Sequence, residues 1–290
     1  MDFHLLQPIE QLIFKLTYCK RIGISGKWKI VSFAEQYQKT FFSVEEIIRI
    51  AGITQYQAVF KKSWTEISDS WLEQEARKQQ FITWLSLEYP GDLQHFYQAP
   101  LILFYVGNLE LLQHRKLAFV GARDASKYGL QVLYQLIPRI VQQNIVTVSG
   151  LAKGIDQYSH ELTIHAGGHT IGVIGCGLDL CYPREVASIF LEMRRNHLIL
   201  SEYPKGTKIQ RHHFPMRNRI IAGLSQGACV IEAKERSGSL ITAQLALEYG
   251  KEVFAIPGEI LSGQSNGCHR LIQDGAKCVC SIQDILEELP

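Results

Sequence analysis

From residue 116 to residue 256 the chain alternates short apolar runs with helical runs, and this alternation limits the fold more than any other feature. Strands are predicted at 116–120, 145–149, 170–174, 198–201, 228–232 and 252–256. Helices are predicted between them at 128–143, 155–165, 186–194, 217–224 and 239–249. The strand runs are rich in Val and Ile and apolar on both faces, as in a buried parallel sheet covered by helices on both sides. The sequence therefore predicts an α/β fold with a mostly parallel sheet.

Residues 1–75 differ from this pattern and are predicted to form a small all-helical domain. Apolar residues recur at helical spacing from Leu12 to Cys19 and from Val44 to Ile50. Turns at Gly23 and Gly52 resemble helix-hairpin-helix modules, which present backbone N–H groups to a phosphate, but a plain glycine helix stop is the preferred interpretation. The polar stretch 69–80 is the expected boundary, so the α/β domain is predicted over 80–290, with strands at 81–84 and 101–106 and a last helix at 282–289.

Composition narrows the class of protein without identifying it. The formal net charge is only +2, so the distribution of charge must decide whether nucleic acid binds. None of the seven cysteines forms a C-x-x-C pair, which favours a reducing cytoplasm over a secreted disulfide framework. The N-terminus lacks the pattern of a signal peptide, and no apolar run approaches the ~20 residues that span a bilayer. We expect a cytoplasmic protein with no membrane association.

Several predicted strands end in glycine-containing loops, and ligands of open parallel sheets bind at such ends. Gly121 follows the first strand, Ser149 and Gly150 lead into Lys153 after the second, and residues 175–179 and 232–239 follow two others. Glycine lets the backbone approach a phosphate closely, although βα turns also need glycine for their own geometry. No G-x-G-x-x-G or G-x-x-x-x-G-K-[ST] motif occurs, so no dinucleotide or ATP cofactor is expected.

Residues 202–225, EYPKGTKIQRHHFPMRNRIIAGLS, concentrate positive charge. The segment contains five cations, Lys205, Lys208, Arg211, Arg217 and Arg219, and no Asp or Glu occurs from 203 to 231. Phe214 lies among them, and cations beside an aromatic ring are what single-stranded nucleic acid requires. A solvated loop is the alternative. We expect Arg217 and Arg219 near a helix start, where the helix dipole disfavours cations unless an anion binds.

Other chemistry finds little support in the sequence. Asp156 and His160 lie four residues apart on a predicted helix, which favours a structural hydrogen bond between them over acid–base catalysis. His160, His165 and His169 lack the carboxylate or cysteine neighbours of a metal site. We therefore predict no catalytic residue, no metal and no cofactor.

The motifs VGAR, SGLAKGIDQYSH, GVIGCGLDLCYP, SEYPKG, HFPMRNRIIAGLS, IEAKERSGSLITAQLALEYGKEVFAIPG and LIQDGA follow one another in this order. In this arrangement the chain resembles the DprA (Smf) family from about Tyr89 to Ala276. The resemblance implies an extended Rossmann-type fold preceded by a small SAM-like domain. It further implies single-stranded DNA binding, protection of incoming DNA and loading of the recombinase RecA during natural transformation, and a homodimer formed through the C-terminal part of the α/β domain.

By the same resemblance, a set of named residues forms the DNA pocket. The pocket would be lined by Arg123, Arg211, Phe214, Asn218 and Arg219 and flanked by Gly121, Ser149, Gly150 and Lys153. The chain departs from the family pattern in two places: no C-terminal winged-helix domain is expected before Pro290, and His269 stands where the family usually has Asn.

Two rival functions remain open at this point. Nucleotide phosphoribohydrolases of the LOG type use a PGGxGT loop, whereas residues 235–242 read ERSGSLIT and Gln244 stands near the position of a carboxylate. A domain that senses a free nucleotide is the other alternative, although the basic segment is longer than one nucleotide needs.

Overall fold

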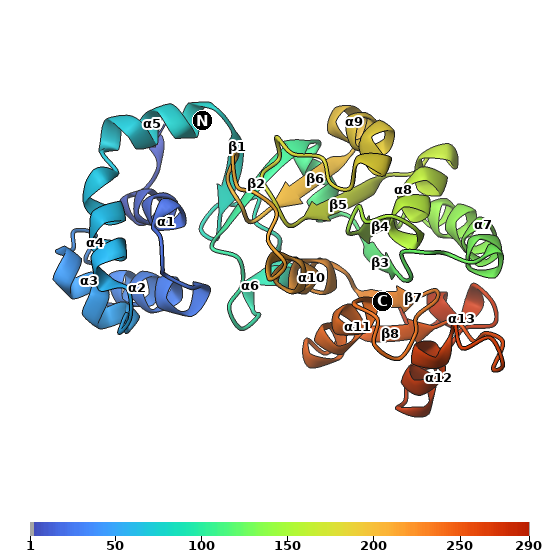
Figure 1. The fold of residues 1–290 in the computed structure, drawn as a ribbon. Helices are drawn as coiled ribbons and strands as arrows, with labels where there is room; N and C mark the ends of the chain where they lie inside the picture. Colours follow the sequence, from blue (N-terminus) through green and yellow to red (C-terminus); the bar gives the residue numbers. More distant parts are fainter. Residues whose placement is uncertain (1–2, 290) are drawn as a thin grey trace.

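The computed structural model describes residues 3–289, which form one mixed sheet, helices on both of its faces and an N-terminal group of helices (Figure 1). We call residues 3–77 the N-terminal helical unit. Its elements are η1 (Phe3–Leu5), α1 (Pro8–Tyr18), α2 (Ile24–Gln36), α3 (Val44–Ala51), α4 (Gln57–Glu66) and α5 (Asp69–Arg77). Over the described range the helices are too short or too polar to span a bilayer.

The sheet has nine strands in the order β1-β2-β6-β5-β4-β3-β7-β8-β9. In chain order they are β1 (Gln80–Thr83), β2 (Ile102–Gly107), β3 (Lys116–Val120), β4 (Val146–Ser149), β5 (Thr170–Ile174), β6 (Leu198–Ser201), β7 (Gly227–Val230), β8 (Glu252–Ala255) and β9 (Lys277–Cys278). β2 pairs antiparallel with β1 and with β6, and all other pairs are parallel. The predicted Rossmann-type fold with a mostly parallel sheet is confirmed.

Helices cover both faces of this sheet because its strands are apolar on both sides. In β3, Leu117 and Phe119 pack on the face covered by α7 (Lys127–Gln142) and α8 (Ile155–His165), whereas Ala118 and Val120 pack on the opposite face. The remaining helical elements are α6 (Gly91–Gln94), η2 (Leu109–Gln113), η3 (Arg184–Val186), α9 (Ala187–Asn196), α10 (His213–Leu224), α11 (Ser239–Glu248), α12 (Asn266–Gln273) and α13 (Gln283–Leu286). The opposite face is covered mainly by α10 and α11.

The order of the strands creates a switch point in the middle of the sheet. β3 to β6 follow one another in one direction, after which the chain returns through α10 to place β7 on the other side of β3. The carboxyl ends of β3 and β7 therefore diverge into loops on opposite sides of a crevice, the usual ligand position in folds of this kind.

Buried contacts join the N-terminal helical unit to the β1 edge of the sheet. The rings of Phe14 and Phe81 stack with centroids 4.6 Å apart, and Thr83 Oγ1 donates to Glu10 Oε1 at 2.6 Å. The Trp28 indole N–H reaches the Ala99 carbonyl at 2.8 Å. A stacked aromatic pair of this kind contributes about 0.5–1.5 kcal/mol beyond its buried area.

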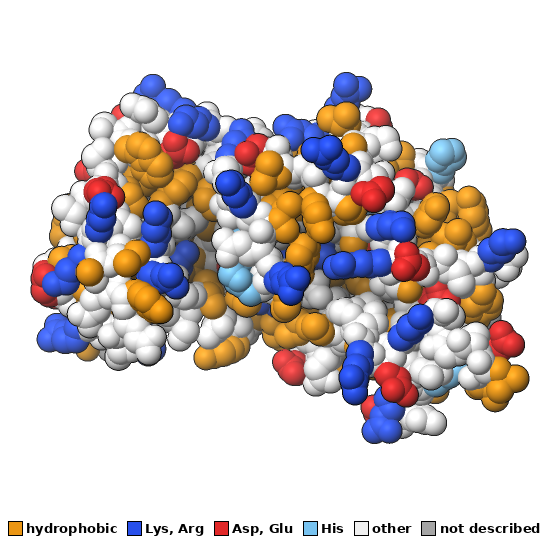
Figure 2. All heavy atoms as spheres, viewed as in Figure 1, with side chains coloured by type: hydrophobic (Ala, Val, Ile, Leu, Met, Phe, Trp, Pro, Cys, Tyr) orange, Lys and Arg blue, Asp and Glu red, His pale blue; other side chains and the backbone are white. Residues whose placement is uncertain are grey.

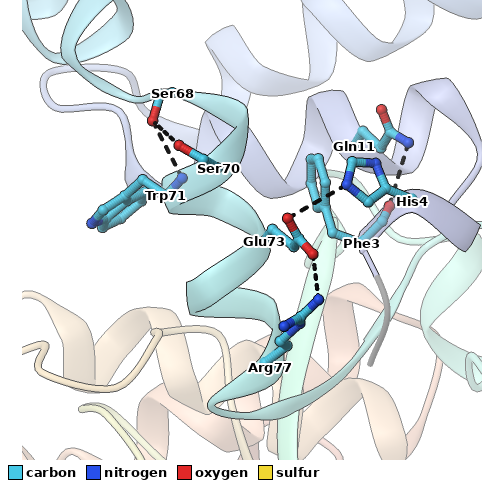
Figure 3. Close-up of polar contacts among 8 residues, drawn as sticks. All are labelled: Phe3, His4, Gln11, Ser68, Ser70, Trp71, Glu73 and Arg77. Atoms are coloured by element: carbon cyan, nitrogen blue, oxygen red, sulfur yellow. Dashed lines mark hydrogen bonds and ion pairs between the residues drawn. The ribbon is translucent and has the colours of Figure 1, made fainter.

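The polar stretch 69–80, where the sequence predicts the domain boundary, is mostly helix α5, which ends at Arg77 shortly before β1 begins at Gln80. Ser68 caps this helix by accepting the Trp71 N–H, and Leu72 and Ala76 bury its apolar face. Glu73 pairs with Arg77 within α5 and contacts His4 of η1 across the junction of the two elements (Figure 3). The helix is polar in sequence because only one narrow face of it is buried.

The glycine turns of the N-terminal helical unit are explained by helix geometry. Gly52 has φ +69° and ends α3 in the left-handed conformation that glycine adopts without strain. Gly23 precedes α2 in an extended conformation. At the other end of the chain, the last helix is shorter than predicted and spans Gln283–Leu286 rather than 282–289.

Candidate functional site

The carboxyl edge of the sheet is hollowed at the switch point. Two adjoining cavities of about 170 and 560 Å³ lie there, and we call them together the cleft. They share a set of lining residues, namely Arg123, Ala152, Tyr182, Phe214 and Arg217. The loops after β3, β4, β5 and β7 and the first turns of α10 form the walls. Figure 2 shows apolar side chains in the middle of this face with Lys and Arg side chains around them.

Two aromatic rings stand at the cleft. Phe214 lies in the first turn of α10 and is half-buried, and Tyr182 lies 48% exposed with its ring centroid 6.2 Å from that of Phe214. The Arg123 guanidinium lies over the Phe214 ring at 5.9 Å. Sequence reasoning missed Tyr182, although its position just after the glycine-containing loop 175–179 could have indicated it. The pair forms an apolar platform with a cation at its side.

Arg123 and Arg211 are the free cations of the cleft. Both are exposed, and in the described part of the chain neither has a carboxylate within ion-pairing distance. Lys153 also lines the cleft, but its ammonium lies 3.2 Å from the Asp124 carboxylate. Since that pair is open to solvent, it holds Lys153 only weakly. All three cations can therefore bind an anion without breaking a strong ion pair.

Arg217 also lines the cleft, but protein groups already bind its guanidinium. It is buried, and its guanidinium donates to the Val173 carbonyl at 2.6 Å and to the Gly150 carbonyl. The Asp156 carboxylate accepts the backbone N–H of Gly150 at 3.1 Å, so Arg217 and Asp156 bind the two polar groups of the same glycine. Burial lowers the pKa of Arg217 and raises the pKa of Asp156, and each charge opposes the shift of the other. A Cβ on Gly150 would collide with the guanidinium, so glycine is required there for packing.

The expected helix start near Arg217 is wrong. The helix begins at His213, so Arg217 lies in its second turn and Arg219 still deeper. Arg219 is buried and pairs with Glu202 at 2.5 Å, and it does not line the cleft. The argument from an unfavourable helix dipole therefore fails, because a carboxylate of the protein, one residue before the acid-free stretch, compensates Arg219.

The remaining residues proposed from the sequence divide between the cleft and its surroundings. Gly121 and Asn218 line it, and the Asn218 amide donates to the Gly238 carbonyl at 3.3 Å. Ser149 is buried below it and donates to the Phe119 carbonyl at 2.6 Å. Lys205 and Lys208 are exposed on the loop before α10 and are not among the cleft residues. The fold thus brings most of the proposed set to one place.

The expected Asp156–His160 hydrogen bond is also wrong. His160 Nδ1 lies 2.6 Å from Thr170 Oγ1 instead. Burial, with a smaller effect of His197 and Arg217, lowers the pKa of His160 to about 3. Within residues 3–289, no group of three or more His, Cys, Asp or Glu side chains could hold a metal ion.

Hydrolytic chemistry would need a carboxylate that reaches the cleft. Asp156 is the one carboxylate among its described lining residues, and it is buried and engaged with the Gly150 N–H. Gln244, which stands near the hydrolase carboxylate position, is exposed on α11 and donates to Glu248 at 3.2 Å. Glu235 is exposed on the preceding loop and does not line the cleft. No observation favours the hydrolase.

The fold and the switch-point cleft define a Rossmann-type α/β protein, and folds of this class hold phosphate-bearing ligands at such glycine-containing loops. Residues 80–290 match the model of the family described as DNA recombination-mediator protein A. The chain is 45% identical to the DNA processing protein DprA of Streptococcus pneumoniae over 278 residues, 95% of this chain and 96% of that protein. It is 50% identical to the DprA of Bacillus subtilis over 206 residues, 71% of this chain and 69% of that protein. The chain belongs to the DNA recombination-mediator protein A family.

Solved structures agree with this assignment. The X-ray structure of DprA from Streptococcus pneumoniae superposes with a TM-score of 0.89 at 42% identity, over 100% of this chain and 99% of that chain. A structure of DNA processing protein A from Helicobacter pylori, which concerns its single-stranded DNA binding mode, gives a TM-score of 0.66 at 30% identity over 73% of this chain and 98% of that chain.

Proposed function

We propose that this protein binds single-stranded DNA in the cleft without catalysing a reaction on it. The observation that carries the proposal is the platform of Phe214 and Tyr182 beside Arg123 and Arg211, two exposed cations with no carboxylate partner in the described chain. The single-stranded DNA binding mode of the Helicobacter pylori relative supports it.

Each part of the cleft has a distinct task under this proposal. Arg123, Arg211 and the backbone N–H groups of the glycine loops bind phosphates, and Phe214 stacks on a base at about 1–3 kcal/mol. Duplex DNA binds more weakly because its stacked bases cannot reach the ring. Affinity falls as salt rises, with a log–log slope of about −0.7 for each phosphate neutralised on a single strand.

The wider role follows the family resemblance and is part of the proposal. The protein protects incoming single strands and loads RecA onto them during natural transformation, in the cytoplasm. All seven cysteines are free, which suits a reducing compartment. The protein has no catalytic residue or cofactor in this role.

A homodimer forms through the C-terminal part of the α/β domain. Two exposed apolar side chains are consistent with a dimer surface here: Ile260 and Leu261, in the loop after β8, are 76% and 88% exposed. His269, which stands where the family usually has Asn, lies 3.0 Å from the Gly258 carbonyl and so holds the base of that loop. A dimer ties two DNA segments together and gains from effective concentration.

Fluorescence anisotropy of a labelled oligothymidine at two salt concentrations tests the binding proposal. Wild-type protein, Arg211→Ala and the control Lys61→Ala are compared, with a duplex of equal length and a free nucleotide as competitors. We expect tight, salt-sensitive binding that favours the single strand, a weaker Arg211→Ala variant and an unchanged Lys61→Ala variant. Equal affinity of all three proteins for the oligothymidine would refute a DNA site in the cleft. Displacement of the oligothymidine by the free nucleotide, but not by the duplex, would refute a site for a polymer.

A further inference from the structure

Another cavity lies where the N-terminal helical unit meets the sheet, and its lining is strongly basic. It has a volume of about 400 Å³, and four cations line it: Arg77 and Lys78 at the end of α5, Arg194 on α9 and Lys205 before α10. No Asp or Glu is among its described lining residues. We call this cavity the junction pocket. Figure 2 shows Lys and Arg side chains gathered on this part of the face, near the end of α5 and below α9.

Carboxylates near the junction pocket only partly neutralise it. Glu73 pairs with Arg77, and Glu75 pairs with Lys78 at 2.5 Å. The other two cations bind backbone oxygens, because Arg194 donates to Leu178 at 3.0 Å and Lys205 donates to Lys78. Arg194 and Lys205 therefore have no carboxylate within ion-pairing distance among the described residues, and a bound anion would complete the site.

A buried side chain holds the segment of Lys205 against the end of α5. Gln79 is 5% exposed, its amide oxygen accepts the Lys205 backbone N–H at 2.9 Å, and its amide nitrogen donates to the Tyr18 hydroxyl at 2.6 Å. This bridge links α1, the end of α5 and the loop before α10. The pocket is thus assembled from the N-terminal helical unit and the α/β domain together.

Two loops connect the junction pocket with the cleft. In the loop after β5, Cys176 lines the cleft and Leu178 lines the junction pocket, and two residues span at most about 7 Å. In the loop before α10, Ile209 lines the cleft and Lys205 lines the junction pocket. The Gly177 N–H donates to the Thr207 carbonyl at 3.0 Å and joins the two loops. A single DNA strand that leaves the cleft over these two loops would reach the junction pocket.

We propose that the junction pocket binds backbone phosphates of the single strand where it leaves the cleft, so that the N-terminal helical unit forms part of the DNA path. This inference rests on the proposed function of the cleft. It gives the N-terminal helical unit a direct role in binding, with Arg77 and Lys78 as its contribution. The interaction is with phosphates, so it extends the site without adding sequence preference.

An oligothymidine length series tests this role. Lengths from about 4 to about 16 nucleotides cover the usual range of single-strand sites. We compare the wild type, the double variant Lys78→Ala/Lys205→Ala, and Lys62→Ala as a control cation on α4. Both side chains of the double variant are exposed, and Arg194→Gln, which keeps a donor for the Leu178 carbonyl, provides an independent second variant. Circular dichroism confirms that each variant is folded.

We expect the double variant to match the wild type with the shortest oligonucleotides and to bind the longest several-fold more weakly. Its salt slope with long oligonucleotides should be smaller by about 0.7 for each phosphate that the variant no longer neutralises. Equal affinity and slope at every length would overturn the inference, and this is the result expected if the pocket holds only a free anion. A uniform loss at every length would also overturn it, because the pocket would then act within the cleft. Failure of the wild type to bind any oligonucleotide would instead overturn the proposed function.

Discussion

The N-terminal helical unit and the cleft both carry cations, but they use them differently. In the N-terminal helical unit, Lys39, Lys61 and Lys62 each pair with a glutamate at 2.5–3.7 Å. In the cleft, Arg123 and Arg211 have no such partner among the described residues. The glutamates that meet these lysines lie on α3 and α4, whereas no described element places a carboxylate beside Arg123 or Arg211. A basic residue therefore indicates a ligand only where the fold leaves its charge uncompensated.

The largest effect is expected when a buried arginine of the cleft is compared with an exposed one. Arg217→Ala leaves the Asp156 charge and the Val173 carbonyl buried without their partner, so we expect a loss of about 3–5 kcal/mol in the free energy of unfolding. Arg211→Ala, on the exposed rim, should change it by less than about 0.5 kcal/mol. Urea unfolding measures both. Similar losses for the two variants would remove the distinction between structural and ligand-facing cations.

The aromatic platform gives the next largest effect. Phe214→Ala should weaken oligothymidine binding by about 1–3 kcal/mol, because a base loses its stacking partner. Phe41, 87% exposed on the N-terminal helical unit, is the matched control, and Phe41→Ala should leave affinity unchanged. Anisotropy at one salt concentration is sufficient. Equal oligothymidine affinity of the two variants would show that Phe214 does not stack on a base.

Acid should destabilise the α/β domain through His160. Its pKa is lowered to about 3, so below the ordinary histidine pKa the unfolded chain takes up a proton that the folded chain does not. Stability should therefore fall as pH drops from about 6.5, by up to about 1.4 kcal/mol per unit, and the effect should be absent above that pH. Unfolding midpoints of wild type and His160→Gln between pH 7 and pH 5, about the range in which the slope develops, measure it. Parallel pH profiles would contradict the assignment to His160.

The smallest change in stability is expected for a paired lysine of the N-terminal helical unit. Lys62 and Glu66 form an exposed i,i+4 pair at 3.7 Å, so Lys62→Ala should cost about 0.3–0.5 kcal/mol. Thermal unfolding at low and high salt would show the loss only at low salt. Oligothymidine affinity should not change. A clear loss of binding would mean that paired helical cations also reach DNA.

The sequence predicted the sheet well and parts of the cleft poorly, for one physical reason. β3, β5, β6 and α8 were predicted with the bounds that the structure shows, because periodicity and apolar runs report burial locally. The start of α10 was missed by four residues, since HHFPM carries no apolar periodicity. The pairing of Arg219 with Glu202 joins different elements, and the contact of Arg217 with Gly150 joins residues 67 apart.

By itself, the sequence determined which segments form strands and helices, and that glycine loops, cations and Phe214 gather at one edge of the sheet. Only the tertiary structure decided which of those cations are free. Arg217 and Arg219 are engaged by buried partners, Arg123 and Arg211 are left to solvent, and Lys205 is carried to the junction pocket. Charge compensation depends on groups that folding brings within a few ångströms, and no local pattern encodes that distance.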